Sequence, residues 1–88
     1  MTFQARLKKC MRDGNLTVAD LARWFERPHP TMRSWVENGV EPGGGPQDRA
    51  QVLETLTQLE KLIAKNNKFP VPRLSPRERI AYLGALRG

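Results

Sequence analysis

The chain has 88 residues, 39% of them hydrophobic and 27% charged, which is the balance of one small folded domain. No apolar run approaches the roughly 20 residues that a membrane-spanning helix needs, so we expect no membrane partner. Cys10 is the only cysteine and His29 the only histidine, which excludes a disulfide framework and a zinc site with three or four Cys or His ligands.

The net charge is +6, and ten of the fifteen basic residues are arginines. The charge is uneven along the chain: residues 1–40 carry +3, residues 41–66 carry −1 and residues 67–88 carry +4. The forked guanidinium of arginine matches phosphates and guanine edges. The composition therefore favours an anionic partner, most often nucleic acid, over a merely basic protein.

The first segment carries apolar side chains on one helical face, at Phe3, Leu7, Cys10 and Met11. This spacing predicts a helix over about residues 2–12. We expect Gly14 to end it in the left-handed conformation, as glycine commonly does. Cys10 lies on the apolar face and is expected to be buried as a small hydrophobe.

Two short helices are predicted next. Thr17-Val-Ala-Asp20 reads as a capping box, with Asp in place of Glu, and opens a helix over about residues 18–25. A proline-containing turn leads to a third helix over about residues 30–38. The buried side of the third helix is defined by Met32, Trp35 and Val36. We place Trp24 half exposed beside the apolar stripe of the second helix, packing against the long helix that follows.

A glycine-rich linker then precedes a long helix over about residues 47–65. Its apolar seam is Val52, Leu56, Leu59 and Ile63, flanked by Leu53 and Leu62. Residues 69–72 contain two prolines and are expected to be extended. Ser75-Pro-Arg-Glu78 is a second capping box and opens a last helix over about residues 76–86.

These elements predict an all-α fold of about five helices without strands. We divide the chain into residues 1–66, a helix-turn-helix domain with its long helix, and residues 67–88, a proline-containing linker with a C-terminal helix. The second part either belongs to the same domain or forms a separate tail for oligomerisation.

Residues Leu16 to Pro42 resemble the helix-turn-helix of the Cro/lambda-repressor (XRE-type) family, and the resemblance extends to about residue 63. The matched positions are the small residue Ala22, the apolar Met32, and Trp35, Gly39 and Pro42 of a closing Trp-x-x-x-Gly-x-x-Pro. One position departs from the family, because Glu26 stands where a left-handed glycine is usual. Either the turn takes another path or the register is shifted.

The resemblance implies that the third helix reads double-stranded DNA in the major groove. The expected base-contacting residues are Arg33 and Ser34 opposite its buried stripe, Thr31 at the flank and His29 at the entry, with Arg33 suited to guanine. The expected phosphate contacts are Thr17, Arg23 and Arg27. Further DNA contacts are expected from Arg73, Arg77 and Arg79. The alternative for these surfaces is a solvated polar face.

We therefore expect a small phage or bacterial transcriptional regulator, acting as a repressor in the cytoplasm of the bacterial host cell. No catalytic cluster, cofactor motif or metal-binding cluster is evident, so an enzyme is not expected. Three rivals remain: a small terminase that forms a ring, an XRE-type antitoxin with a toxin partner, and a protein-binding adaptor without DNA affinity.

The long helix is expected to mediate self-association, with a dimer favoured, through Val52, Leu56, Leu59 and Ile63. The alternative is that the C-terminal helix covers this seam within one chain.

Overall fold

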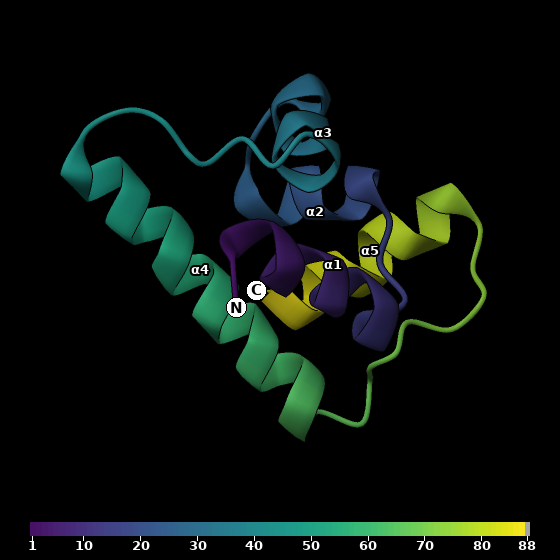
Figure 1. The fold of residues 1–88 in the computed structure, drawn as a ribbon. Coiled ribbons are helices and arrows are strands. Elements are labelled where there is room, and N and C mark those ends of the chain that lie inside the picture. The colour runs from purple at the N-terminus through teal and green to yellow at the C-terminus, as the bar shows by residue number, and fades with distance from the viewer. Residues whose placement is uncertain (88) are drawn as a thin grey trace.

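The computed structural model describes residues 1–87. Within them the chain forms five helices joined by loops, and no strand (Figure 1). The helices are α1 (Phe3–Gly14), α2 (Val18–Phe25), α3 (His29–Glu37), α4 (Pro46–Lys65) and α5 (Pro76–Arg87). The predicted all-α class is confirmed, and every predicted helix boundary lies within two residues of the observed one. Across residues 1–87, no helix combines the length and the apolar character that crossing a bilayer requires.

Both predicted capping boxes are present. The Thr17 hydroxyl accepts a hydrogen bond from the Asp20 backbone N–H (3.1 Å), and the Asp20 carboxylate accepts one from the Thr17 N–H (2.9 Å). Ser75 and Glu78 make the equivalent pair at the start of α5, both at 3.4 Å. Each box satisfies donors that a helix start leaves without partners, which explains why α2 and α5 begin where they do.

The end of α1 differs from the prediction. Asn15, with φ 54°, takes the left-handed conformation, and Gly14 is the last helical residue. Gly14 instead packs closely against α4, since a Cβ there would lie 3.1 Å from the end of the Ile63 side chain. The Asn15 side chain donates to the backbone carbonyl of Val71 (2.7 Å), so this turn also holds the segment before α5.

Aromatic side chains join the first three helices. Trp35 of α3 meets Phe3 of α1 and Phe25 of α2 edge-on, with ring centroids 5.6 and 6.5 Å apart. Trp24, which we expected to be half exposed, is only 6% exposed. It lines one small hollow with Val52 of α4 and another with Leu83 of α5, so two helices cover it.

The apolar seam of α4 belongs to the core of the single chain. Val52, Leu56 and Leu59 are at most 3% exposed without any partner copy. The prediction that these residues form a self-association surface is therefore wrong, and Ile63, which is partly buried against the same core, lies with them. The seam is covered because α1 packs along α4, whereas α5 packs mainly against α2.

Residues 67–87 share this core, which resolves the alternative left open for the C-terminal part. Phe69 and Val71 are buried, and the Val71 N–H donates to the Gly14 carbonyl (2.8 Å). Leu83 of α5 is buried in the same cluster. Local sequence did not identify Phe69 and Val71 as core residues, because they lie outside any helix.

We expect Leu59→Ala to lower the free energy of unfolding by about 2–5 kcal/mol, because it removes a fully buried side chain and leaves a cavity. Leu59→Glu should prevent folding altogether. Urea denaturation followed by circular dichroism measures both effects, and Gln58→Ala on the exposed side of α4 is the matched control. A folded, monomeric Leu59→Glu chain would contradict this placement of the seam.

Candidate nucleic-acid interface

The turn between α2 and α3 fixes the direction in which α3 leaves the pair. Glu26 itself adopts the left-handed conformation, with φ 56° and ψ 48°. Its N–H donates to the Arg23 carbonyl (3.2 Å), and the Arg27 N–H donates to the Ala22 carbonyl (2.9 Å). Neither expected alternative is therefore correct: the chain keeps a left-handed residue at Glu26 without glycine. This conformation costs about 1–2 kcal/mol for an L residue.

The third helix buries one side and leaves the other to solvent. Met32, Trp35 and Val36 are at most 4% exposed, as predicted. Pro28 precedes the helix, and no side chain caps its first turn. In helix-turn-helix DNA-binding proteins, the N-terminal end of the recognition helix meets the base edges.

The predicted base-contacting residues lie on the open side of α3. His29 and Arg33 are exposed, whereas Thr31 and Ser34 are half-buried at its flanks. The Arg33 guanidinium lies 3.9 Å from the Glu37 carboxylate, and both side chains are more than half exposed. Such a surface pair contributes little to stability, so Arg33 can exchange Glu37 for another acceptor at small cost.

A single hollow at the turn is lined by three residues that we predicted to touch DNA, two of them at phosphates and one at a base. Arg23, Arg27 and His29 line it, together with Glu26 and two small residues, Ala19 and Ala22. The side chain of Arg27 donates to the Phe25 carbonyl at 3.2 Å. The structure thus brings together basic groups from α2, the turn and α3 on one concave surface.

The other predicted DNA contacts are distributed differently. Thr17 is exposed at the start of α2, where its hydroxyl also serves as the cap. Arg73 is exposed on the segment that leads into α5, and Arg77 is exposed in the first turn of α5. The side chain of Arg79 is only 13% exposed and is paired with Asp20, so its prediction as a DNA contact is wrong.

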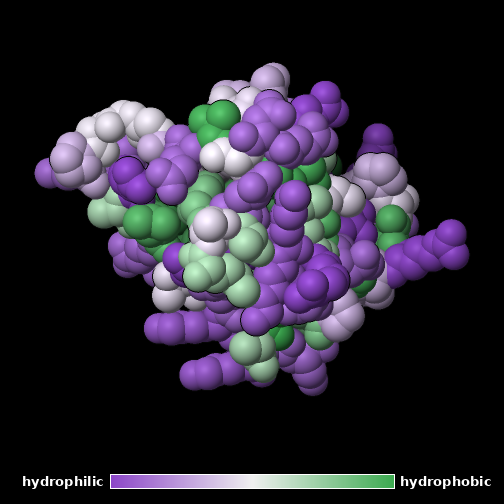
Figure 2. Space-filling model, viewed as in Figure 1, coloured by the Kyte–Doolittle hydropathy of each residue, from purple (hydrophilic) through white to green (hydrophobic). Residues whose placement is uncertain are grey.

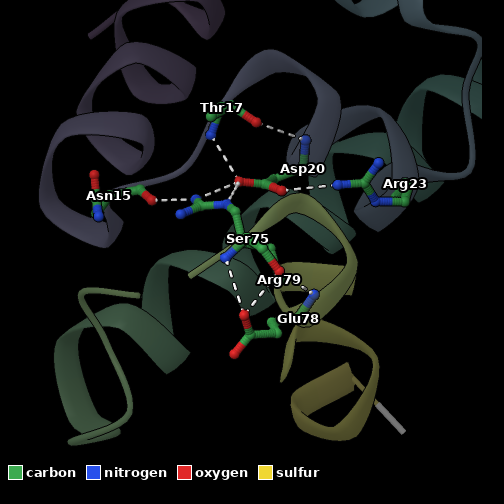
Figure 3. A network of polar contacts seen from close by, with 7 residues as sticks. All are labelled: Asn15, Thr17, Asp20, Arg23, Ser75, Glu78 and Arg79. Carbon is green, nitrogen blue, oxygen red and sulfur yellow. Dashed lines mark hydrogen bonds and ion pairs between the residues drawn. The ribbon is translucent and has the colours of Figure 1, made fainter. Parts of the chain in front are cut away.

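Asp20 is the centre of a buried polar network, shown in Figure 3. Its carboxylate is 1% exposed and accepts hydrogen bonds from Arg79 Nε (3.0 Å), Arg79 Nη2 and Arg23 Nη2 (2.9 Å). Arg79 also donates to the Asn15 carbonyl (2.6 Å). The capping box suggested only the local bonds of Asp20, because Arg79 is 59 residues away in sequence.

Burial raises the pKa of Asp20, but the hydrogen bonds from Arg79 and Thr17 outweigh it, so the pKa lies below its usual value. The carboxylate is therefore charged at neutral pH. Both carboxylate oxygens accept hydrogen bonds, and these bonds offset the cost of removing the charge from water.

The last residue of α5 contacts the opposite end of α2. Arg87 donates to the Arg23 carbonyl (3.1 Å) and lies 3.2 Å from the Glu26 carboxylate. Because Arg79 meets the start of α2 and Arg87 meets its end, α5 contacts α2 along its whole length. The helix that carries the basic hollow is thus fixed from the side away from α3.

Arg6 of α1 and Glu60 of α4 form a second, part-buried pair, joined by two hydrogen bonds of 3.1 and 2.5 Å. Within residues 1–87, no three His, Cys, Asp or Glu side chains lie close enough to hold a metal ion. Burial, together with the charge of Glu60, raises the pKa of Cys10 to about 11, so its thiol stays protonated at neutral pH. The predicted burial of Cys10 is confirmed.

Comparisons of the chain with protein-family models, with curated proteins and with solved structures found no match. The family resemblance of residues 16–63 therefore stays a prediction.

Asp20→Asn should lower the free energy of unfolding at pH 7 by about 3–5 kcal/mol, because it leaves the Arg79 charge buried without its partner. The native pKa of Asp20 lies below the usual 3.8, so the stability it contributes is present above that pH and is lost as pH falls through the native pKa. When unfolding is measured between pH 7 and pH 2, the free energy of unfolding should therefore fall less with acid in Asp20→Asn than in the wild type.

Asp48→Asn, an exposed position in the first turn of α4, is the control and should follow the wild-type pH profile. Arg79→Lys keeps the charge but removes the forked donor, and it provides a milder variant if Asp20→Asn does not fold. Identical pH profiles for wild type and Asp20→Asn would refute the role assigned to this carboxylate.

Proposed function

We propose that this chain binds double-stranded DNA sequence-specifically, with α3 in the major groove. The observation that carries the proposal is the α2–α3 pair, whose left-handed turn directs the polar side of α3 to solvent in a chain of charge +6. Arg23, Arg27 and His29 lie together beside the start of α3, and Arg23 remains 43% exposed although it also pairs with Asp20, which favours an anionic partner at this surface.

The residues divide into two roles. Arg33 is the group best suited to guanine, since its two terminal donors match the O6 and N7 acceptors. His29, Thr31 and Ser34 supply further contacts to base edges. Phosphate contacts, which position the protein without reading sequence, come from Thr17, Arg23, Arg27, Arg73 and Arg77.

A regulator of transcription, acting as a repressor, is the biological role we propose for this activity. Paired half-sites would require a dimer, and its interface must lie outside the buried seam of α4. A ring in sedimentation would instead favour the terminase role, and copurification with a toxin the antitoxin role. An adaptor would show no DNA affinity.

Selection of bound duplexes from a random pool tests the proposal directly. An enriched sequence supports it, and a pool that stays random contradicts sequence-specific binding. The salt dependence of binding to the selected duplex is the second measurement. With about five phosphate contacts per chain, the log–log slope should be about −4 to −5 per protomer. A flat salt response would exclude nucleic acid as the partner.

Arg33→Ala should weaken binding to the selected duplex by about 1–3 kcal/mol and relax the preference at one base position. Folding should be unchanged, because the Arg33 side chain is 59% exposed. Lys61→Ala, on the C-terminal half of α4, is the matched control and should bind as wild type does. Wild-type affinity and selectivity in Arg33→Ala would show that α3 does not read bases in this orientation.

A further inference from the structure

A second surface feature lies far from α3. A groove runs between the C-terminal half of α4 and the end of α5, and its lining includes Leu62 and Leu86 at the floor and Lys61 and Lys65 at the rim. Figure 1 shows α3 and the C-terminal end of α4 at opposite ends of the molecule. A partner in this groove would therefore leave the proposed DNA-reading surface free.

The floor of the groove is apolar and incompletely covered. Leu62 and Leu86 pack against the core but remain only partly buried. On the face drawn in Figure 2, hydrophobic areas are small patches within a mostly hydrophilic surface. On α4 the lining residues Gln58, Lys61, Leu62 and Lys65 recur at helical spacing over two turns, a length of roughly 10 Å. This length matches two turns of another helix laid alongside.

The rim of the groove is positively charged. Among residues 1–87, neither Lys61 nor Lys65 forms an ion pair, and no carboxylate lines the groove. The two lysines are one turn apart on α4, where like charges repel weakly. Arg87 also lines the groove, but its charge is paired with Glu26. Two lysines therefore remain to meet a negative partner.

We propose that this groove binds an acidic amphipathic helix of a partner protein. Apolar side chains at helical spacing on the partner would cover Leu62 and Leu86, and its flanking carboxylates would pair with Lys61 and Lys65. A second copy of this chain would bring the same lysines against each other in a two-fold contact. Single-stranded nucleic acid is disfavoured because no aromatic side chain lines the groove for bases to stack on.

The proposal is independent of DNA binding and is tested with a synthetic helical peptide that carries leucines on one face and glutamates on both flanks. Its binding to the ¹⁵N-labelled chain is followed by amide chemical shifts. We expect the largest changes around Leu62, Lys65 and Leu86, with α3 unaffected. A peptide with lysine in place of every glutamate should bind much more weakly.

The double variant Lys61→Glu, Lys65→Glu should weaken binding of the acidic peptide by about tenfold or more, because it reverses both rim charges. The double variant Lys8→Glu, Arg12→Glu makes the same change of charge at the same spacing on exposed positions of α1, and it should bind as wild type does.

Several outcomes would overturn the proposal. One is that the acidic and basic peptides bind with equal affinity, and another is that the two double variants lose the same amount of affinity for the acidic peptide. A third is that the chemical-shift changes centre on α3. Each of these three results would contradict the proposal. Concentration-dependent dimers that only Lys61→Glu, Lys65→Glu abolishes would assign the groove to a second copy. Loss of duplex binding in that variant would assign it to DNA.

Discussion

The packing of α5 against α2 depends on one buried ion pair, between Asp20 at the start of α2 and Arg79 in α5. The carboxylate is out of reach of water and is stabilised by Arg79, Arg23 and the Thr17 backbone N–H. Such a pair adds little net stability compared with apolar side chains of the same size, but breaking it is costly. Its effect is to specify position: it ties α2, the loop at Asn15 and α5 into one arrangement.

That arrangement sets where α3 points. α5 holds α2 near both ends, through Arg79 at the start and through Arg87 at the turn. Glu26, the left-handed residue of that turn, is thereby part of the same set of contacts. Because Arg87 contacts both the Arg23 carbonyl and the Glu26 carboxylate, the end of α2 that leads into α3 is held by α5 as well as by its own local hydrogen bonds. A change in α5 would therefore reach the proposed DNA surface through α2.

The sequence predicts most of what is local in this structure. Helix limits follow from apolar spacing and from caps such as Thr17, because both depend on residues within one or two turns. The choice of partner for each apolar surface is not local. Apolar spacing alone predicts a dimer contact for Leu59 and half exposure for Trp24, because it does not show which helices cover them. The role of Arg79 was missed for the same reason, since exposed and paired arginines look alike in sequence.

Of the candidate site, the positions of His29 and Arg33 were predictable from the helix, and the hollow at the turn was not.

Whether α3 reads the DNA sequence is decided by the chemical-shift footprint of the selected duplex on the ¹⁵N-labelled chain, compared with that of a scrambled duplex of equal length. We expect the selected duplex to change the amide signals of α3 and of the start of α2 beyond what the scrambled duplex does, while the groove of Leu62 and Leu86 stays unchanged. Identical footprints for the two duplexes, or a footprint that leaves α3 untouched, would contradict the proposal that α3 reads the DNA sequence.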